Sequence, residues 1–179
     1  MASSPRKPRV LVGVSGSVAT VKVPELTVRL AEFAEVKIVV TKSADFFLQR
    51  AKEYHPSHWD KFEAIRESVP VLRDADEWIC WDMVGDPVVH IELKDWADLI
   101  VVTPLSANTL AKLANGMSDN LLTSVCRAWM MSKPFLYAPA MNTDMWDHPM
   151  TARHLRILDE LRYEMIEPVE KKLACGVIG

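Results

Sequence analysis

Four segments with small, hydroxyl-bearing or amide side chains each come at the end of an apolar run. They are residues 15–19, 41–47, 103–109 and 139–145. The apolar runs, at 10–14, 36–40, 98–104 and 134–139, are short and continuous, as is typical of strands buried on both faces. In an open α/β sheet, ligands bind beyond the carboxyl ends of the strands. We therefore expect the four segments to converge on one ligand site.

The first segment has the composition of a phosphate-binding turn. Gly16 lets the backbone approach a ligand closely, and the helix that follows offers free N–H groups to an anion. The glycine spacing is not G-x-G-x-x-G, and the second run ends at Thr41 rather than at an acid that could hold a ribose hydroxyl. This disfavours a dinucleotide. A terminal phosphate, as in FMN, would suit the hydroxyls of Ser15, Ser17, Thr41 and Ser43, although ordinary helix capping explains the same residues.

The order of apolar patterns predicts the architecture that positions these segments. Helical patterns at 18–33, 41–47, 106–115, 119–129 and 151–161 alternate with the strand runs, and a short strand is expected at 163–166. Such alternation implies a central parallel sheet with helices on both faces. The 179 residues fit one domain, 1–179, with residues 1–7 disordered. Residues 50–70, which are polar and contain two prolines, predict a surface excursion that can include one short helix.

Composition and charge exclude several classes of protein. The net charge of −3 and the absence of a long basic stretch argue against nucleic acid as a partner. No apolar stretch approaches the roughly 20 residues of a membrane helix, and the first residues lack the pattern of a secretory signal. Three cysteines form neither a disulfide framework nor a metal knuckle, and no metal site is expected. These features favour a cytoplasmic protein.

Strings distributed along the chain carry a resemblance to a known family. They are GSVA at 16–19, DPVVHIEL at 86–93, WAD at 96–98, PLSANTL at 104–110, DNLLT at 119–123, RAW at 127–129, APAMNTDMW at 138–146 and KKLACG at 171–176. In content and order they resemble the flavin-containing cysteine decarboxylases, specifically the phosphopantothenoylcysteine branch. The resemblance covers nearly the whole chain and is weakest across 48–75.

The resemblance implies a fold and an activity. It implies a flavodoxin-like or Rossmann-like three-layer fold with a central parallel sheet, bound FMN, and a homotrimer with active sites between subunits. The implied reaction converts 4′-phospho-N-pantothenoylcysteine to 4′-phosphopantetheine in coenzyme A biosynthesis. We expect phosphopantothenoylcysteine to be the small-molecule partner.

The resemblance also implies roles for particular residues. His90 corresponds to the catalytic base and Cys175 to the proton donor of the final reduction. Asn142 corresponds to the group that binds the substrate carboxylate, and Met141, Lys172 and Ala174 belong to the same substrate-binding set. The expected FMN site comprises Gly16, Ser17, Val18, Thr41, Ser43, Phe47, Ser106, Ala107, Asn108, Thr109 and Ala140.

The implied reaction explains why these residue types are needed. An N-acylated cysteine has no electron sink for decarboxylation, and oxidation of its CH₂–SH to a thioaldehyde supplies one. A histidine titrates near neutral pH and suits the base. The neutral amide of Asn142 can hold a carboxylate without a permanent cation, which would stabilise the ground state. A thiol can protonate carbon at the end, and Lys171 and Lys172 lie close to Cys175 in sequence, where they could tune that thiol.

Several residues have simpler interpretations. Taken singly, His90, Cys175 and Asn142 are typical of a structural histidine, an inert thiol and a helix cap, and only their joint occurrence with the family strings favours chemistry. Cys80 and Cys126 are expected to be packing residues. Further expectations are structural or surface roles for His148 and His154, exposed loop positions for His55 and His58, and core or interface positions for Trp96, Trp129 and Trp146.

The sequence departs from the family after Cys175. Relatives continue Cys-Gly-Asp-x-Gly-x-Gly-Ala, a flap over the substrate, whereas this sequence has Val177 at the aspartate position and ends at Gly179. We therefore expect a truncated flap. Other functions of related folds stay open: a peptidyl-cysteine decarboxylase, a flavin prenyltransferase, and a non-catalytic regulatory subunit of a protein phosphatase.

Overall fold

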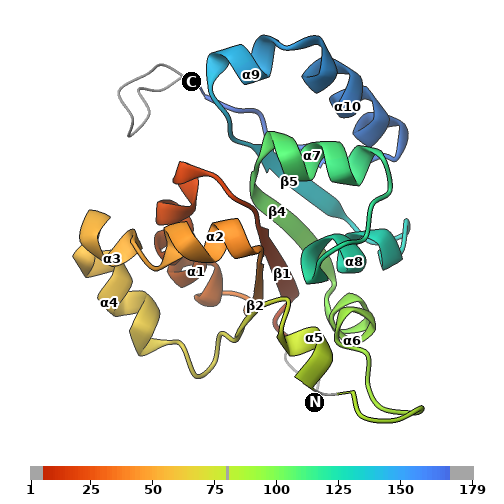
Figure 1. The fold of residues 1–179 in the computed structure, drawn as a ribbon. Coiled ribbons are helices and arrows are strands. Elements are labelled where there is room, and N and C mark those ends of the chain that lie inside the picture. Colours follow the sequence, from red (N-terminus) through yellow and green to blue (C-terminus); the bar gives the residue numbers. More distant parts are fainter. Residues whose placement is uncertain (1–5, 80, 170–179) are drawn as a thin grey trace.

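A six-stranded parallel sheet forms the centre of the computed structural model, which describes residues 6–79 and 81–169 (Figure 1). Its strand order is β3-β2-β1-β4-β5-β6, and every paired neighbour is parallel. The strands are β1 (Arg9–Val14), β2 (Glu35–Val40), β3 (Val71–Leu72), β4 (Leu99–Leu105), β5 (Phe135–Pro139) and β6 (Glu164–Met165). The four expected strand runs are confirmed, and the fifth is the short β6. Nothing in the sequence pattern predicted β3.

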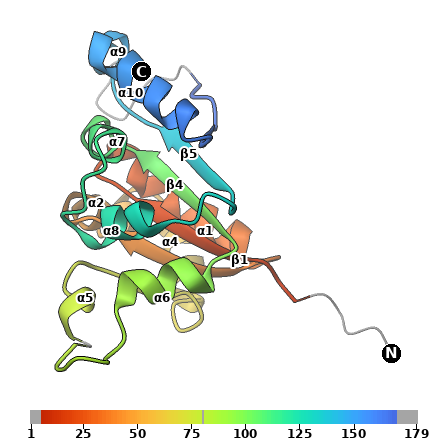
Figure 2. The same cartoon turned by 90° about the vertical axis from the view of Figure 1, so that its right-hand side faces the viewer.

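Helices connect the strands and cover both faces of the sheet (Figures 1 and 2). A 3₁₀ turn, η1, spans Val18–Lys22. The α-helices are α1 (Val23–Ala31), α2 (Lys42–Leu48), α3 (Ala51–Tyr54), α4 (Pro56–Ala64), α5 (Asp76–Ile79), α6 (Val89–Trp96), α7 (Ala107–Ala114), α8 (Leu121–Ala128), α9 (Thr143–Asp147) and α10 (Pro149–Glu160). The expected helix at 18–33 is thus divided, with Pro24 in the first turn of α1, where a missing N–H is tolerated. The expected three-layer fold is confirmed.

The core consists of two clusters, one on each face of the sheet. Alternation along the strands separates them, so that Ile100 and Val102 of β4 face one cluster and Val101 faces the other. The first cluster joins the sheet to α6, α7, α8 and α10, and the second joins it to α1, α2 and α4. This burial on both faces explains the continuous apolar runs.

Residues 50–70 contain more helix than expected for a surface excursion. They contain α3 and α4, and Phe62 of α4 is buried against the second cluster. His55 and His58 are therefore half-buried helix or helix-junction residues, and the expectation of exposed loop histidines is wrong. His55 Nε2 lies 2.7 Å from Lys22 Nζ, and His58 Nδ1 lies 3.5 Å from Glu25 Oε2.

The two ends of the described chain bear on two further expectations. The disorder expected for residues 1–7 falls mostly outside the described residues. Arg6 and Lys7 are described, and Arg6 donates two hydrogen bonds of 2.7 Å to Asp98. Among the described residues, no helix is both long and apolar enough to cross a membrane.

Replacing Asp98 by asparagine is expected to lower the free energy of unfolding at neutral pH. The side-chain hydrogen bonds from Arg6 and the backbone N–H of Arg9 hold the pKa of Asp98 well below its usual range. A depressed pKa in the folded state stabilises the protein above the unfolded value of about 3.9, and the contribution is lost as the pH falls below it. The effect should be small because the pair is partly exposed.

Urea denaturation at neutral and acidic pH measures this effect. The difference in the free energy of unfolding between wild type and Asp98→Asn should shrink as the pH falls below the pKa that Asp98 has in the unfolded chain. A difference that is equal at both pH values would show that charge on Asp98 does not stabilise the fold. Asp95→Asn, an exposed site on α6, is the matched control.

Candidate functional site

A cavity of about 520 Å³ lies at the carboxyl edge of the sheet, beyond β1, β2, β4 and β5. The strands that follow β1 in sequence are added on one side of it, as β2 and β3, and then on its other side, as β4, β5 and β6. The cavity lies between β1 and β4, where this order of strand addition reverses. Its volume is within the usual range for a small-molecule site. The lining residues are Gly16, Ser17, Val18, Thr41, Lys42, Ser43, Phe47, Asp74, Ser106, Ala107, Asn108, Thr109, Lys112, Asp119, Asn120, Ala140, Met141 and Met145.

Four helix N-termini open onto this cavity. Ser17 caps η1, Thr41 caps α2, Ser106 caps α7 and Asn120 caps α8, and each cap residue lines the cavity. The hydroxyl oxygens of Ser17, Thr41 and Ser106 accept hydrogen bonds from backbone N–H groups, with N···O distances of 3.2–3.3 Å. Helix N-termini carry partial positive charge and unpaired N–H groups, so their convergence favours an anion. The two interpretations of these hydroxyl residues are thus compatible, because capping places them at the ligand site.

Ser15 does not serve as a phosphate donor in this arrangement. Its side chain is fully buried, donates to the carbonyl of Pro104 at 2.9 Å and accepts from the backbone N–H of Ser106 at 2.7 Å. The hydroxyl therefore joins the loop after β1 to the loop after β4. The expectation that Ser15 faces a phosphate is wrong, since its bonding capacity is used within the chain.

Gly16 permits a close approach between the loop after β1 and helix α2. A Cβ atom on Gly16 would lie 2.5 Å from the Cβ of Ser43. No side chain can rotate away from such a contact, because Ser43 Cβ is fixed by the α2 backbone. Glycine at this position therefore sets the width of the cavity between η1 and α2.

Gly16→Ala is expected to destabilise the protein by about 1–3 kcal/mol, the usual cost of overpacking. It should also weaken FMN binding, because α2 must move. Thermal unfolding and fluorescence titration with FMN measure the two effects. The double variant Gly16→Ala/Ser43→Gly removes the clashing atom and should recover the stability of the Ser43→Gly control. If Gly16→Ala alone matches wild type in both measurements, close packing at Gly16 does not shape the cavity.

Charged residues at the cavity were not among the expected site residues. Lys112 Nζ donates to Asp119 at 2.6 Å, and this hydrogen bond lowers the pKa of the Asp119 carboxyl. Asp74 accepts from the backbone N–H of Leu121 at 3.0 Å, fixing the loop after β3 to the start of α8. Lys42 lies in the first turn of α2. The DNLLT string contained the only sequence signal for Asp119 and Asn120.

The cavity residues fit an FMN group. The helix N-termini suit its phosphate, and the apolar side chains of Val18, Phe47, Met141 and Met145 suit a planar ring. The residue that follows β2 is Thr41, whereas dinucleotide-binding proteins commonly have an acid there that binds a ribose hydroxyl. This difference agrees with a mononucleotide. All eleven residues expected to bind FMN line this cavity, as does Met141.

Asn142 lies beside the cavity, as the N-cap of α9. Its Oδ1 accepts from the backbone N–H of Met145 at 3.0 Å, so it has the helix-cap role that the simpler interpretation proposed. Within the described part of the chain, its Nδ2 group has no hydrogen-bond partner. The amide can therefore cap α9 and still donate to a ligand.

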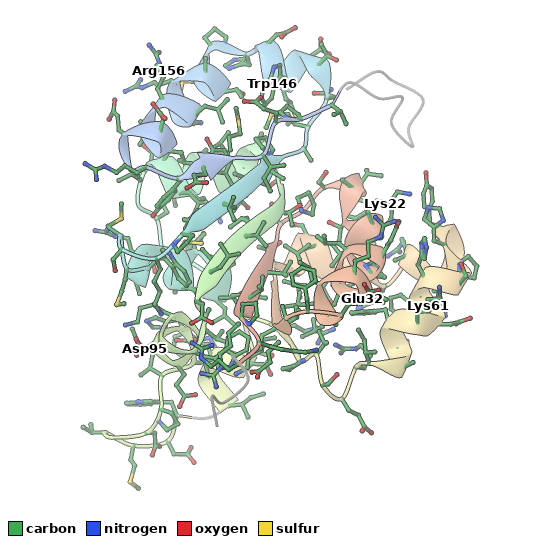
Figure 3. The ribbon with its side chains drawn as sticks, turned by 180° about the vertical axis from the view of Figure 1, so that it is seen from behind. Lys22, Glu32, Lys61, Asp95, Trp146 and Arg156 are labelled. Carbon is green, nitrogen blue, oxygen red and sulfur yellow. The ribbon has the colours of Figure 1, made fainter. Side chains whose placement is uncertain are left out.

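His90 is not brought to the cavity within one chain. It lies in the first turn of α6, and its Nδ1 is 2.5 Å from Oε1 of Glu77 on α5. Helix α6 and helix α9 are at opposite ends of the molecule in every view; Figure 3 labels Asp95 of α6 and Trp146 of α9. Cys175, Lys172 and Ala174, together with the expected truncated flap, lie outside the described residues.

Several cysteine, histidine and tryptophan side chains outside the cavity have structural roles. Cys126 is a free, buried thiol whose pKa is raised by burial, which confirms a packing role, whereas Cys80 lies outside the described residues. His148 caps α10 and His154 is buried. Trp129 is buried in the first cluster, as expected for a core residue.

Trp96 of α6 and Trp146 of α9 are both half-buried. Lys37 Nζ lies 4.5 Å from the ring centre of Trp96. Residues 6–79 and 81–169 contain no group of three or more His, Cys, Asp or Glu side chains arranged to hold a metal ion.

Fold and site together define a class of protein: a doubly wound α/β protein with an anion-binding, nucleotide-sized cavity at its topological switch point. Comparison with known proteins narrows this class. The family model described as Flavoprotein matches residues 2–179. The chain therefore belongs to the flavoprotein family.

Individual relatives agree with this assignment. A phosphopantothenoylcysteine decarboxylase of Arabidopsis thaliana is 50% identical over 177 residues, which cover 99% of this chain and 79% of that protein. The solved structure of a phosphopantothenoylcysteine decarboxylase variant with pantothenoylaminoethenethiol has a TM-score of 0.87 and 49% identity, covering 97% of this chain and 89% of that one. The FMN binding protein AtHal3 has a TM-score of 0.83 and 48% identity, with coverages of 97% and 90%.

Proposed function

We propose that this chain is an FMN-dependent enzyme that decarboxylates 4′-phospho-N-pantothenoylcysteine to 4′-phosphopantetheine in coenzyme A biosynthesis. The observation that carries the proposal is the cavity at the strand ends, which four helix N-termini make suitable for a phosphate and whose lining includes all eleven expected FMN residues. Relatives about 50% identical over nearly the whole chain are phosphopantothenoylcysteine decarboxylases.

The cavity residues divide the task of holding FMN. The caps Ser17, Thr41 and Ser106 and the N–H groups behind them would hold the phosphate, and Phe47 and Met145 would pack against the ring. When bound, FMN supplies the two-electron oxidation of the substrate thiol to a thioaldehyde and the matching reduction at the end. The side chains of this protein need only position the substrate and move protons.

Asn142 and His90 would provide the substrate contacts. The Nδ2 group of Asn142, beside Met141, would donate to the substrate carboxylate without adding a permanent charge that stabilises the ground state. The imidazole of His90 would take the proton released during oxidation. Cys175 would protonate carbon in the final step, with Lys172 and Ala174 beside it in the substrate site.

We further propose a homotrimer in which His90 of one protomer meets the cavity of the next. Support comes from the separation of α6 and α9 within one chain (Figure 2) and from exposed large apolar side chains close to His90 in the sequence. Trp78 is 75% exposed, Met83 66% and Val84 93%, with Ile91 also exposed. Exposed apolar side chains that form a contiguous patch are typical of protein interfaces.

Subunit complementation tests whether the site is shared. His90→Asn and Asn142→Ala should each be inactive, but every mixed trimer would contain one site with both native side chains. Random mixing in equal amounts should therefore restore roughly one quarter of wild-type activity in a closed cyclic trimer. If mixed trimers recover no activity, either His90 and Asn142 act within the same protomer or they do not have the assigned roles.

Product formation tests the proposed activity itself. The purified protein should show a visible flavin spectrum and convert phosphopantothenoylcysteine to CO₂ and 4′-phosphopantetheine in equal amounts. A peptide ending in cysteine serves as the control substrate and should react far more slowly. Protein that stays colourless with added FMN, or that gives no CO₂, would contradict the proposal.

We also place the protein in the cytoplasm. The buried free thiol of Cys126 suits a reducing compartment. Imaging of the tagged full chain in cells checks this location.

A further inference from the structure

Both carboxylate oxygen atoms of Glu77 contact the same residue, His90. Oε1 lies 2.5 Å from the ring nitrogen Nδ1, and Oε2 accepts from the backbone N–H of His90 at 3.1 Å. The two residues are on different helices, with Glu77 on α5 and His90 in the first turn of α6. This pair of contacts fixes both the position of the backbone and the plane of the imidazole ring.

The contact with a carboxylate favours a proton on one particular ring nitrogen. An ionised carboxylate only accepts hydrogen bonds, so beside an ionised Glu77 the donor toward Oε1 is Nδ1. In a neutral imidazole the lone pair then belongs to Nε2. Within the described part of the chain, Nε2 has no hydrogen-bond partner, so it is free to accept a proton from a ligand.

The contact is partly sheltered from solvent. The side chain of Glu77 is 13% exposed and that of His90 is 26% exposed, so most of the pair is covered while part of the imidazole remains accessible. Water competes less well for a sheltered contact made through two hydrogen bonds than for a surface ion pair, which usually contributes little to the free energy of unfolding. The arrangement is therefore suited to holding a base rather than to adding general stability.

We propose that Glu77 is a positioning residue that holds His90 in the Nδ1–H tautomer, so that Nε2 acts as the base. This inference rests on the proposed function, in which His90 is the base. Neither residue needs to touch FMN for the inference to hold. Glu77 acts only through His90.

Glu77→Gln is the discriminating variant, because glutamine has almost the same shape. Its carbonyl oxygen can still accept from the His90 backbone, which turns its NH₂ group toward Nδ1. That group donates, so Nδ1 becomes the acceptor and the proton moves to Nε2. The rate of flavin reduction by substrate under anaerobic conditions should fall by roughly 100-fold or more, within the range that general-base catalysis contributes. Substrate affinity, thermal stability and oligomeric state should stay near wild type.

Nuclear magnetic resonance reads the tautomer independently of activity. In ¹⁵N-labelled protein, at a pH that leaves the imidazole neutral, the unprotonated nitrogen of His90 should be Nε2 in wild type and Nδ1 in Glu77→Gln. The His90→Asn variant assigns the signal. Glu77→Asp keeps an acceptor-only carboxylate and should recover part of the rate. Glu92→Gln, at an exposed site in the same turn of α6, should leave both rate and tautomer unchanged.

The outcomes separate this inference from the proposed function. Active wild-type protein whose rate and tautomer are unaffected by Glu77→Gln would overturn the role of Glu77 and leave the decarboxylase intact. Wild-type protein without decarboxylase activity would remove the proposed function, and the tautomer would then still report whether Glu77 orients His90. A lower rate with an unchanged tautomer would also overturn the inference, since it would reflect a structural defect.

Discussion

His90→Asn is expected to retain FMN and to lose decarboxylation, with a fall in rate of about 10²–10⁴-fold, the contribution typical of a general base. His90 is not part of the cavity lining of its own chain, so its replacement leaves unchanged the cavity residues that would hold the flavin. Asparagine cannot take a proton near neutral pH. Anaerobic mixing with substrate should therefore show bound flavin that is not reduced, measured by its visible absorbance.

A matched substitution makes the result specific. His58→Asn replaces a histidine on α4, which is also outside the cavity lining, and should react at the wild-type rate. If His90→Asn reduces its flavin as fast as this control, His90 is not the base. If His90→Asn loses FMN altogether, the residue supports the fold of the site rather than proton transfer.

Cys175→Ser is expected to release CO₂ and to stop before the final reduction. A serine hydroxyl is a much weaker acid than a thiol, so the enethiol left by decarboxylation should not be protonated at carbon. A cysteine-to-serine variant of a related phosphopantothenoylcysteine decarboxylase was solved with pantothenoylaminoethenethiol, a compound of this type. Mass spectrometry should find a product lighter than 4′-phosphopantetheine by two hydrogen atoms.

Cys126→Ala is the control for this experiment, because Cys126 is a buried thiol in the core and not part of the cavity. It should form the fully reduced product, at some cost in stability. Reduced product from Cys175→Ser at the wild-type rate would show that another group donates the proton.

Much of the cavity could be predicted from the sequence, for a physical reason. The carboxyl ends of parallel strands meet at one edge, so polar segments after four buried runs must lie close together. Thr41 and Ser106 follow their strands directly and cap the next helix, and local patterns of this kind are visible in a single segment. The family strings then connected these residues with a flavin.

The rest depended on contacts between segments distant in sequence. Asp74 lies beside the start of α8 at the cavity, where it accepts from the backbone N–H of Leu121, 47 positions away. Ser15 is buried by the loop after β4, 91 positions from its partner Ser106. Glu77 and His90 belong to two helices that no apolar pattern predicted. Such contacts arise from tertiary packing, which a local pattern does not contain.

The absorbance of bound flavin during a single turnover tests the central claim most directly. Mixing the protein anaerobically with phosphopantothenoylcysteine should bleach the flavin transiently. The oxidised spectrum should then return, with one CO₂ and one 4′-phosphopantetheine formed for each substrate consumed. CO₂ released while the flavin stays fully oxidised throughout, in wild type and at every substrate concentration, would contradict a decarboxylation driven by oxidation of the substrate thiol.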